Sequence, residues 1–221
     1  MIIAVDGPAG AGKSTVAKLL ASRLDLLYID TGAMYRALTL AVLGRGIDPS
    51  DAQAVASLAE KTSISLVPVP RGAAKVLLDG KDVSLEIRTP QVTRHVSDIA
   101  KIKDVRSIML KLQRGLGSRG NCIMDGRDIG TVVFPDADLK FFIDASFEER
   151  VTRRYNDLAQ LGITGVSREQ VAQDLANRDT IDSTREVAPL KKADDAVHID
   201  TTSMSIGEVV DAMAACVKKE P

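Results

Sequence analysis

The residues best suited to chemistry stand near the start of the chain, in the stretch "GPAGAGKS" at positions 7–14. Gly7, four further residues and then Gly12-Lys13-Ser14 match the pattern G-x-x-x-x-G-K-[ST], the P-loop. Glycines let successive backbone N–H groups turn inward around an anion, while the lysine reaches terminal phosphates and the serine hydroxyl can bind Mg²⁺. The stretch predicts a nucleoside triphosphate site, whose ligands we expect to be Gly7, Pro8, Ala9, Gly10, Ala11, Gly12, Lys13, Ser14 and Thr15.

A P-loop needs a strand before it and a helix behind it, and the sequence supplies both. Residues 1–5 form a short apolar run that is typical of a buried parallel strand. From Ser14 onward the sequence reads as a helix whose apolar positions recur at helical spacing and would pack one face against a sheet: Val16, Leu19, Leu20 and Leu24. The positive end of that helix dipole adds to the anion site.

Length, charge and cysteine use limit the class of protein. A chain of 221 residues with 45% hydrophobic composition can bury one substantial core. A net charge of -1 argues against a basic nucleic-acid surface, so we expect no nucleic-acid partner. Cys122 and Cys216 lack Cys or His at metal-ligand spacing, which indicates core residues in a reducing compartment. With neither a leader pattern nor an apolar run of membrane-spanning length, we expect a cytoplasmic protein without a membrane partner.

Four further apolar runs alternate with helical stretches, and each is expected to be a buried strand: 26–29, 122–124, 139–143 and 197–199. This alternation predicts an α/β fold with a parallel, doubly wound, five-stranded sheet flanked by helices. Ligands bind such sheets at the carboxyl edge, where Asp125 follows a strand. A carboxylate there can hold the water shell of Mg²⁺, so we predict a metal site at Ser14 and Asp125.

Two segments depart from the alternation and divide the chain. Residues 63–90 have the alternating polarity and the Asp79-Gly80 turn signal of a small antiparallel β insert, which could either cover a substrate or be a plain hairpin. Residues 149–188 are expected to form two arginine-bearing helices, opened by the capping patterns Ser146-Glu149 and Ser167-Gln170, that act as a lid. The core then comprises the three remaining segments, 1–62, 91–148 and 189–221.

Arginines gather in and near this lid. Arg150 and Arg154 share one face of the first lid helix with Arg153, and Arg178, Asp182 and Arg185 share a face of the second. A charged helix face is usually only a solvated surface. The number of arginines beside a P-loop nevertheless favours a second phosphorylated substrate. In "DGRDIGTVVFP", Arg127 and Asp128 come just after a strand, where they would face that substrate.

Five stretches together resemble the bacterial cytidylate kinase family: "GPAGAGKS", "DTGAMYR", "EIRTPQV", "DGRDIGTVVFPDA" and "REVAPL". The resemblance covers essentially the whole chain. It implies an adenylate-kinase-like fold, a monomer, and transfer of the γ-phosphoryl group of ATP, with Mg²⁺, to CMP or dCMP. It also implies that the insert at 63–90 belongs to the part of the protein that binds the nucleoside monophosphate.

Carried over position by position, the resemblance implies three groups of acceptor contacts. Thr31, Arg36, Arg127 and Arg185 would surround the α-phosphate, Arg178 and Asp182 would lie near the sugar hydroxyls, and Ser97, Arg106 and Asp128 would read cytosine. Thr31 stands where serine is common in relatives, and it keeps the hydroxyl. The amino group of cytosine is a donor that a carboxylate can accept, whereas uracil presents a carbonyl there.

The expected chemistry needs no general base, because a phosphate monoester with a second pKa of about 6 is already largely deprotonated at neutral pH. We expect Lys13, Mg²⁺, and Arg150 or Arg154 together with Arg178 to stabilise the transferring group. Two alternatives stay open: another small P-loop kinase, acting on a different nucleotide or on an alcohol such as shikimate, and a GTPase-type switch. The chain has neither D-x-x-G nor [NT]-K-x-D, which disfavours the switch.

Overall fold

A parallel sheet forms the centre of the molecule. The computed structural model describes residues 1–67, 69, 74–118, 120–163 and 165–217. The predicted segments 63–90, 91–148, 149–188 and 189–221 extend in part outside these ranges. The five strands lie in the order β2-β6-β1-β7-β8 and all neighbouring pairs are parallel. They are β1 (Ile2–Asp6), β2 (Leu27–Asp30), β6 (Cys122–Asp125), β7 (Leu139–Asp144) and β8 (Val197–Asp200).

The five predicted strands are confirmed, but each ends one residue later than its apolar run, on an aspartate. Polar side chains at the carboxyl edge do not interrupt the ladder, because only the backbone takes part in it. Asp30 and Asp125 are opposite one another in the β2–β6 register. The sheet thus sets out a row of carboxylates at one edge, close to the loops that follow the strands.

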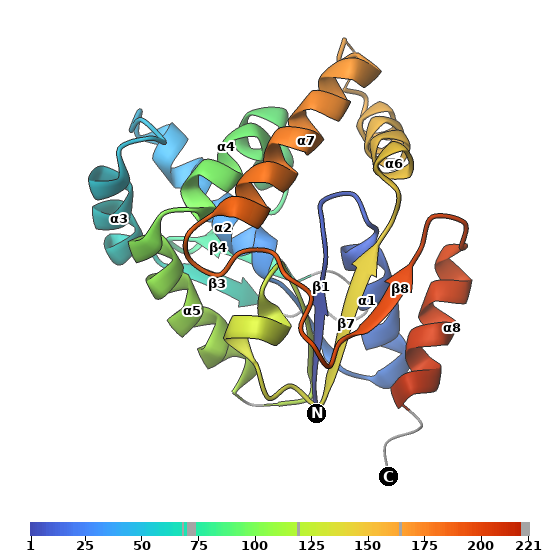
Figure 1. Ribbon diagram of the computed structural model, residues 1–221. Helices are drawn as coiled ribbons and strands as arrows, with labels where there is room; N and C mark the ends of the chain where they lie inside the picture. The colour runs from blue at the N-terminus through green and yellow to red at the C-terminus, as the bar shows by residue number, and fades with distance from the viewer. Residues whose placement is uncertain (68, 70–73, 119, 164, 218–221) are drawn as a thin grey trace.

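Helices cover both faces of the sheet (Figure 1). On one face, α1 (Lys13–Leu24) and α8 (Ile206–Val217) bury the apolar side chains of β1 and β7. On the other face lie α5 (Lys103–Gly117) and a π-helical turn, η2 (Ile129–Val133). Within the described ranges, no helix is both long enough and apolar enough to cross a bilayer. Leu19 of α1, expected on the packing face, is 46% exposed, because it points away from the sheet. The packing of helices on both faces confirms the doubly wound fold.

The antiparallel insert is present beside the core, in the part of it that the structure describes. Its strands are β3 (Ile64–Val67), β4 (Lys75–Leu78) and β5 (Lys81–Asp82), with β4 in the middle. Asp79 and Gly80 join β4 to β5 with φ values of 49° and 83°, as the tight turn requires. A shared hydrophobic cluster packs the insert against helical neighbours: α2 (Thr31–Gly44), α3 (Ala52–Lys61), η1 (Glu86–Arg88) and α4 (Pro90–Ala100).

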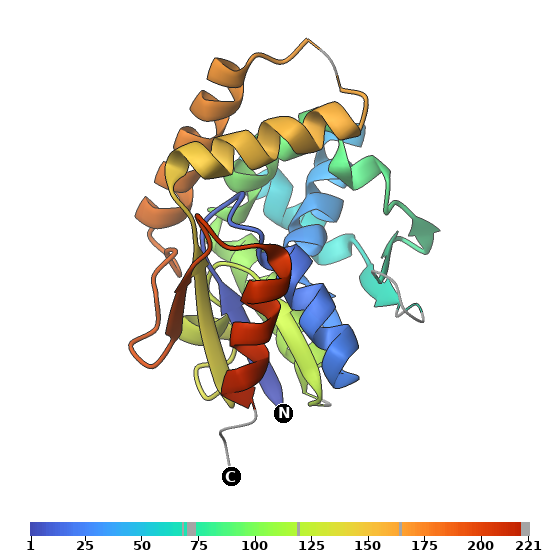
Figure 2. The same ribbon diagram turned by 90° about the vertical axis from the view of Figure 1, so that its right-hand side faces the viewer.

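The predicted lid consists of α6 (Phe147–Gln160) and α7 (Arg168–Thr184), which lie over the carboxyl edge of the sheet (Figures 1 and 2). Val151 and Leu158 pack with residues of α7 and with Ala9 of the P-loop. Helical spacing predicts that Tyr155 shares this packing face, but its side chain is 42% exposed. Val151 and Leu158 are seven residues apart and therefore lie almost directly above one another along the helix, whereas Tyr155 points in a different direction from Leu158.

Two glycines give opposite predictions for stability. A Cβ at Gly7 (φ 146°) would lie 1.9 Å from the carbonyl oxygen of Ile143, so Gly7→Ala should lower the free energy of unfolding by about 4 kcal/mol or more. Gly115, exposed on α5, has nothing within 4 Å of its Cβ position, and Gly115→Ala should raise that free energy by about 0.5–1 kcal/mol. Urea denaturation followed by circular dichroism measures both, and an unaltered Gly7→Ala midpoint would contradict the close approach of the P-loop to β7.

Candidate active site

The carboxyl edge of the sheet and the lid enclose a cleft with a volume of about 1310 Å³. Most small-molecule pockets have volumes of about 300–1,000 Å³, so this cleft has space for two ligands side by side. The P-loop from Ala9 to Thr15, together with Asp125 and Arg154, lines it, whereas Gly7 and Pro8 do not. All residues predicted to bind the acceptor also line it: Thr31, Arg36, Ser97, Arg106, Arg127, Asp128, Arg178, Asp182 and Arg185.

The P-loop has the backbone shape that its sequence predicts. Gly10 and Gly12 have φ values of 78° and 86°, in the left-handed region that few other residues tolerate. Lys13 is buried, and its Nζ donates to the carbonyl oxygen of Pro8 at 2.6 Å. Burial lowers the pKa of Lys13 well below its usual value, and the charge of Arg127 lowers it further. The negative charge of a bound phosphate would offset both effects and raise the pKa of Lys13.

Asp125 forms a small polar centre with two hydroxyl groups. Its Oδ2 accepts from Ser14 Oγ at 2.7 Å and its Oδ1 accepts from the Tyr28 hydroxyl at 2.8 Å. Burial raises the pKa of Asp125 to about 6, and the nearby charge of Asp30 contributes. Sequence reasoning missed Tyr28, because a tyrosine within a short apolar strand gives no sign that its hydroxyl meets the neighbouring strand.

The predicted Mg²⁺ ligands fit the ion only as part of a larger donor set. Ser14 and Asp125 offer hard oxygen donors, which Mg²⁺ prefers. In the part of the chain that the structure describes, no group of three or more His, Cys, Asp or Glu side chains could hold a metal ion by itself. This is the arrangement in which Mg²⁺ takes its other ligands from water and substrate phosphates.

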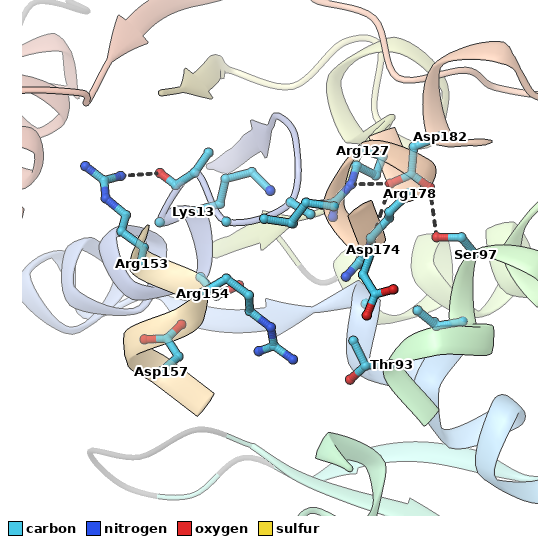
Figure 3. Close-up of a pocket in the computed structure, with 18 of the residues that line it drawn as sticks. Lys13, Thr93, Ser97, Arg127, Arg153, Arg154, Asp157, Asp174, Arg178 and Asp182 are labelled. Atoms are coloured by element: carbon cyan, nitrogen blue, oxygen red, sulfur yellow. Dashed lines mark hydrogen bonds and ion pairs between the residues drawn. The ribbon is translucent and has the colours of Figure 1, made fainter. Parts of the chain in front are cut away.

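The half-buried residues Arg127 and Arg178 lie on the opposite side of the cleft from Arg153 and Arg154 (Figure 3). Burial lowers the pKa of Arg36 to about 9, and Arg178 contributes. Burial lowers the pKa of Arg178 to about 10 in the same way, with Arg127 contributing. Cations that depress one another's pKa form a site that an anion would stabilise.

Two aspartates lie among these arginines. Asp182 accepts from Arg127 Nε at 2.9 Å and from Ser97 Oγ at 3.4 Å, and it pairs with Arg178 (Figure 3). Asp128 accepts from Arg106 Nη2 at 2.5 Å and from Arg185 Nη2 at 3.3 Å. The structure therefore brings most of the predicted acceptor residues into two neighbouring, charge-paired clusters, while Thr31 donates to the backbone oxygen of Asp125.

The three arginines of α6 have different surroundings. Arg150, predicted to be catalytic, does not line the cleft: it donates to Ala9 O at 3.1 Å and pairs with Asp179. Arg153 lines the cleft but is held by Glu149 and by both oxygens of Thr201. Arg154 lines the cleft and makes no hydrogen bond or ion pair with any residue that the structure describes. Helical spacing could not separate them, because Arg150 and Arg154 share a face and only the tertiary contacts differ.

Comparison with known proteins decides the family. The cytidylate kinase family model matches residues 3–219. The chain belongs to the cytidylate kinase family. It is 54% identical over 207 residues to the cytidylate kinase of Bacillus pumilus (strain SAFR-032), covering 94% of this chain and 91% of that one. Identity to the cytidylate kinase of Bacillus velezensis (strain DSM 23117) is 50%, covering 99% and 96%.

A solved structure shares the fold: an uncharacterized protein from Eubacterium ventriosum ATCC 27560, with a TM-score of 0.52 and 12% identity, covering 100% of this chain and 99% of that one. The cytidylate kinase family transfers a phosphoryl group from ATP to CMP or dCMP. The predicted fold class, family and kinase activity are thereby confirmed.

The contacts of α6 predict that its arginines differ in their contribution to stability. Arg150→Ala would leave Asp179 and the oxygens of Ala9 and Ala145 without their donor, so it should lower the free energy of unfolding by about 2–4 kcal/mol. Arg154→Ala should change it by no more than about 0.5 kcal/mol. Urea denaturation without nucleotide measures both free energies of unfolding. An equal decrease in the two variants would show that Arg154 contributes as much to stability as Arg150.

Proposed function

We propose that this protein binds ATP at the P-loop and transfers its γ-phosphoryl group to CMP or dCMP bound among the arginines of the same cleft. The observation that carries the proposal is electrostatic. Lys13 on the donor side is buried, Arg36 and Arg178 on the acceptor side are half-buried, and all three have depressed pKa values, across a cleft that has space for two nucleotides. Two phosphate groups would supply the missing negative charge.

Each acceptor residue has a proposed role that agrees with its surroundings. Thr31, Arg36, Arg127 and Arg185 bind the α-phosphate, Arg178 and Asp182 bind the sugar hydroxyls, and Ser97, Arg106 and Asp128 bind cytosine. Support for the base contact comes from Asp128. A carboxylate has about four lone-pair positions, and Arg106 and Arg185 use two of them, so it can still accept from the cytosine amino group.

Ser14 and Asp125 would hold the Mg²⁺ that accompanies ATP, through the hydroxyl and carboxylate oxygens that the structure brings together. The ion, when bound, neutralises charge on the phosphate oxygens. The acceptor phosphate needs no base, and no histidine lines the described part of the cleft. Lys13, Arg154 and Arg178 stabilise the charge on the transferring group, and the lid excludes water as a competing acceptor. Arg150 acts through Ala9, by holding α6 against the P-loop.

We also propose that the protein is a cytoplasmic monomer with no nucleic-acid partner. Cys122 and Cys216 are both free thiols, which agrees with a reducing compartment. The net charge of -1 offers no general attraction to a polyanion.

A coupled assay of ADP release tests the function, with ATP and Mg²⁺ and with CMP, dCMP, UMP, AMP, shikimate or no acceptor in parallel. We expect rapid turnover with CMP and dCMP. Lys13→Ala serves as the matched variant: it should bind CMP normally but lose about 10²–10³-fold in kcat, since Lys13 faces the donor side. Turnover with shikimate alone would support the small-alcohol kinase, and nucleotide binding without transfer to any acceptor would support the switch.

Asp128→Asn tests the reading of the base. The amide would still fill the space but would accept the cytosine amino group less well, so the ratio of kcat/KM for CMP to that for UMP should fall by about tenfold. The KM for ATP should stay unchanged. Asp138→Asn is the control, because Asp138 is a half-exposed carboxylate at the other end of the sheet, where it accepts from the N–H of Ile2. An unaltered CMP to UMP ratio in Asp128→Asn would remove Asp128 from base recognition.

A further inference from the structure

Asp128 occupies the position immediately before η2, where an aspartate ordinarily caps its own helix through its side chain. Here the side chain makes no capping hydrogen bond. Its two oxygens accept instead from Arg106 and Arg185, on the side of the cleft. The first N–H groups of η2, on Ile129 and Gly130, are buried and need another acceptor.

Asp6 is that acceptor. Its Oδ1 accepts from Ile129 N at 2.8 Å and its Oδ2 accepts from Gly130 N at 2.7 Å. The side chain is nearly fully buried, and it belongs to the last residue of β1, directly before Gly7. The N–H of Gly126 also donates to the carbonyl oxygen of Val5 at 3.0 Å. The segment that carries Asp128 is thus bound to the end of the strand that leads into the P-loop.

We propose that Asp6 is a positioning residue for recognition of the acceptor base: by capping η2 in place of Asp128, it keeps the Asp128 carboxylate turned into the cleft. The inference rests on the proposed function, which assigns Asp128 to cytosine. The geometry requires a carboxylate, since two N–H groups need two acceptor oxygens. An asparagine would offer one acceptor and one donor, and one N–H group would then compete for Asp128.

The far end of η2 offers a matched control. Arg114 on α5 donates from Nε to Val133 O at 3.0 Å and from Nη2 to Val132 O at 2.9 Å. Arg114→Ala therefore loosens the same turn, but it leaves the capped N–H groups of Ile129 and Gly130 in place. A merely structural role for Asp6 predicts that the two variants behave alike, whereas a positioning role predicts that only the Asp6 variant changes the choice of base.

The experiment measures kcat/KM for CMP and for UMP, the KM for ATP and the melting temperature in Asp6→Asn and Arg114→Ala. We expect the CMP to UMP ratio to fall by about tenfold in Asp6→Asn and to stay at the wild-type value in Arg114→Ala, although both variants melt earlier. A wild-type ratio in Asp6→Asn, or an equal fall in Arg114→Ala, would overturn the proposal. If Asp6→Asn does not fold, Asp6→Ser, whose hydroxyl oxygen can accept one N–H, takes its place in the same comparison.

A double-variant cycle with Asp128→Asn gives the second readout. If Asp6 acts through Asp128, Asp6→Asn should cause no further change in the CMP to UMP ratio once Asp128 is already asparagine. An equal fall in both backgrounds would show that Asp6 acts independently and would refute the proposal. Failure of the proposed function looks different: the wild-type protein would then not phosphorylate CMP at all.

Discussion

The loss of solvation by cations gathered in one cleft, together with their mutual repulsion, is the constraint on which the rest of the structure depends. Lys13, Arg36 and Arg178 lose solvation and lower one another's or a neighbour's pKa, which costs folding free energy in the absence of a ligand. Asp182 and Asp128 offset part of that cost by pairing with arginines. Bound phosphate groups would offset the remainder, so that this electrostatic cost would become binding energy for two anionic substrates.

Such a cluster can persist only on a rigid support. The parallel register places the carboxyl ends of β1, β2, β6 and β7 at one edge, and apolar clusters hold the sheet and its helices together. The lid is tied to the P-loop, which is part of this support, by apolar packing and by hydrogen bonds. Ala9 of the P-loop belongs to the hydrophobic cluster of α6 and α7, and Arg150 bonds to the Ala9 carbonyl while pairing with Asp179. A movement of the lid would therefore also displace the P-loop.

The sequence predicts those parts of the site that are local in the chain. The P-loop is a continuous pattern, and apolar runs locate all five strands, although each run stops one residue before the aspartate that ends the strand. What sequence reasoning missed depends on contacts between distant segments. Nothing local distinguishes Arg150 from Arg154, and the partners of Asp6 and Tyr28 lie 123 and 97 residues away along the chain. Resemblance to a family supplied the acceptor residues that periodicity could not.

The ion pairs of Asp128 bear on how a base would be selected. Because Arg106 and Arg185 use only two of the lone-pair positions of the carboxylate, cytosine would join an existing network and would not have to displace a partner. Uracil would bring a carbonyl oxygen toward the same carboxylate, and two acceptors face to face leave both without a donor. Selectivity would then come more from the rejection of uracil than from attraction to cytosine. Rejection of that kind requires a carboxylate that cannot turn away, and the capping of η2 by Asp6 removes the nearest alternative partner to which it could turn.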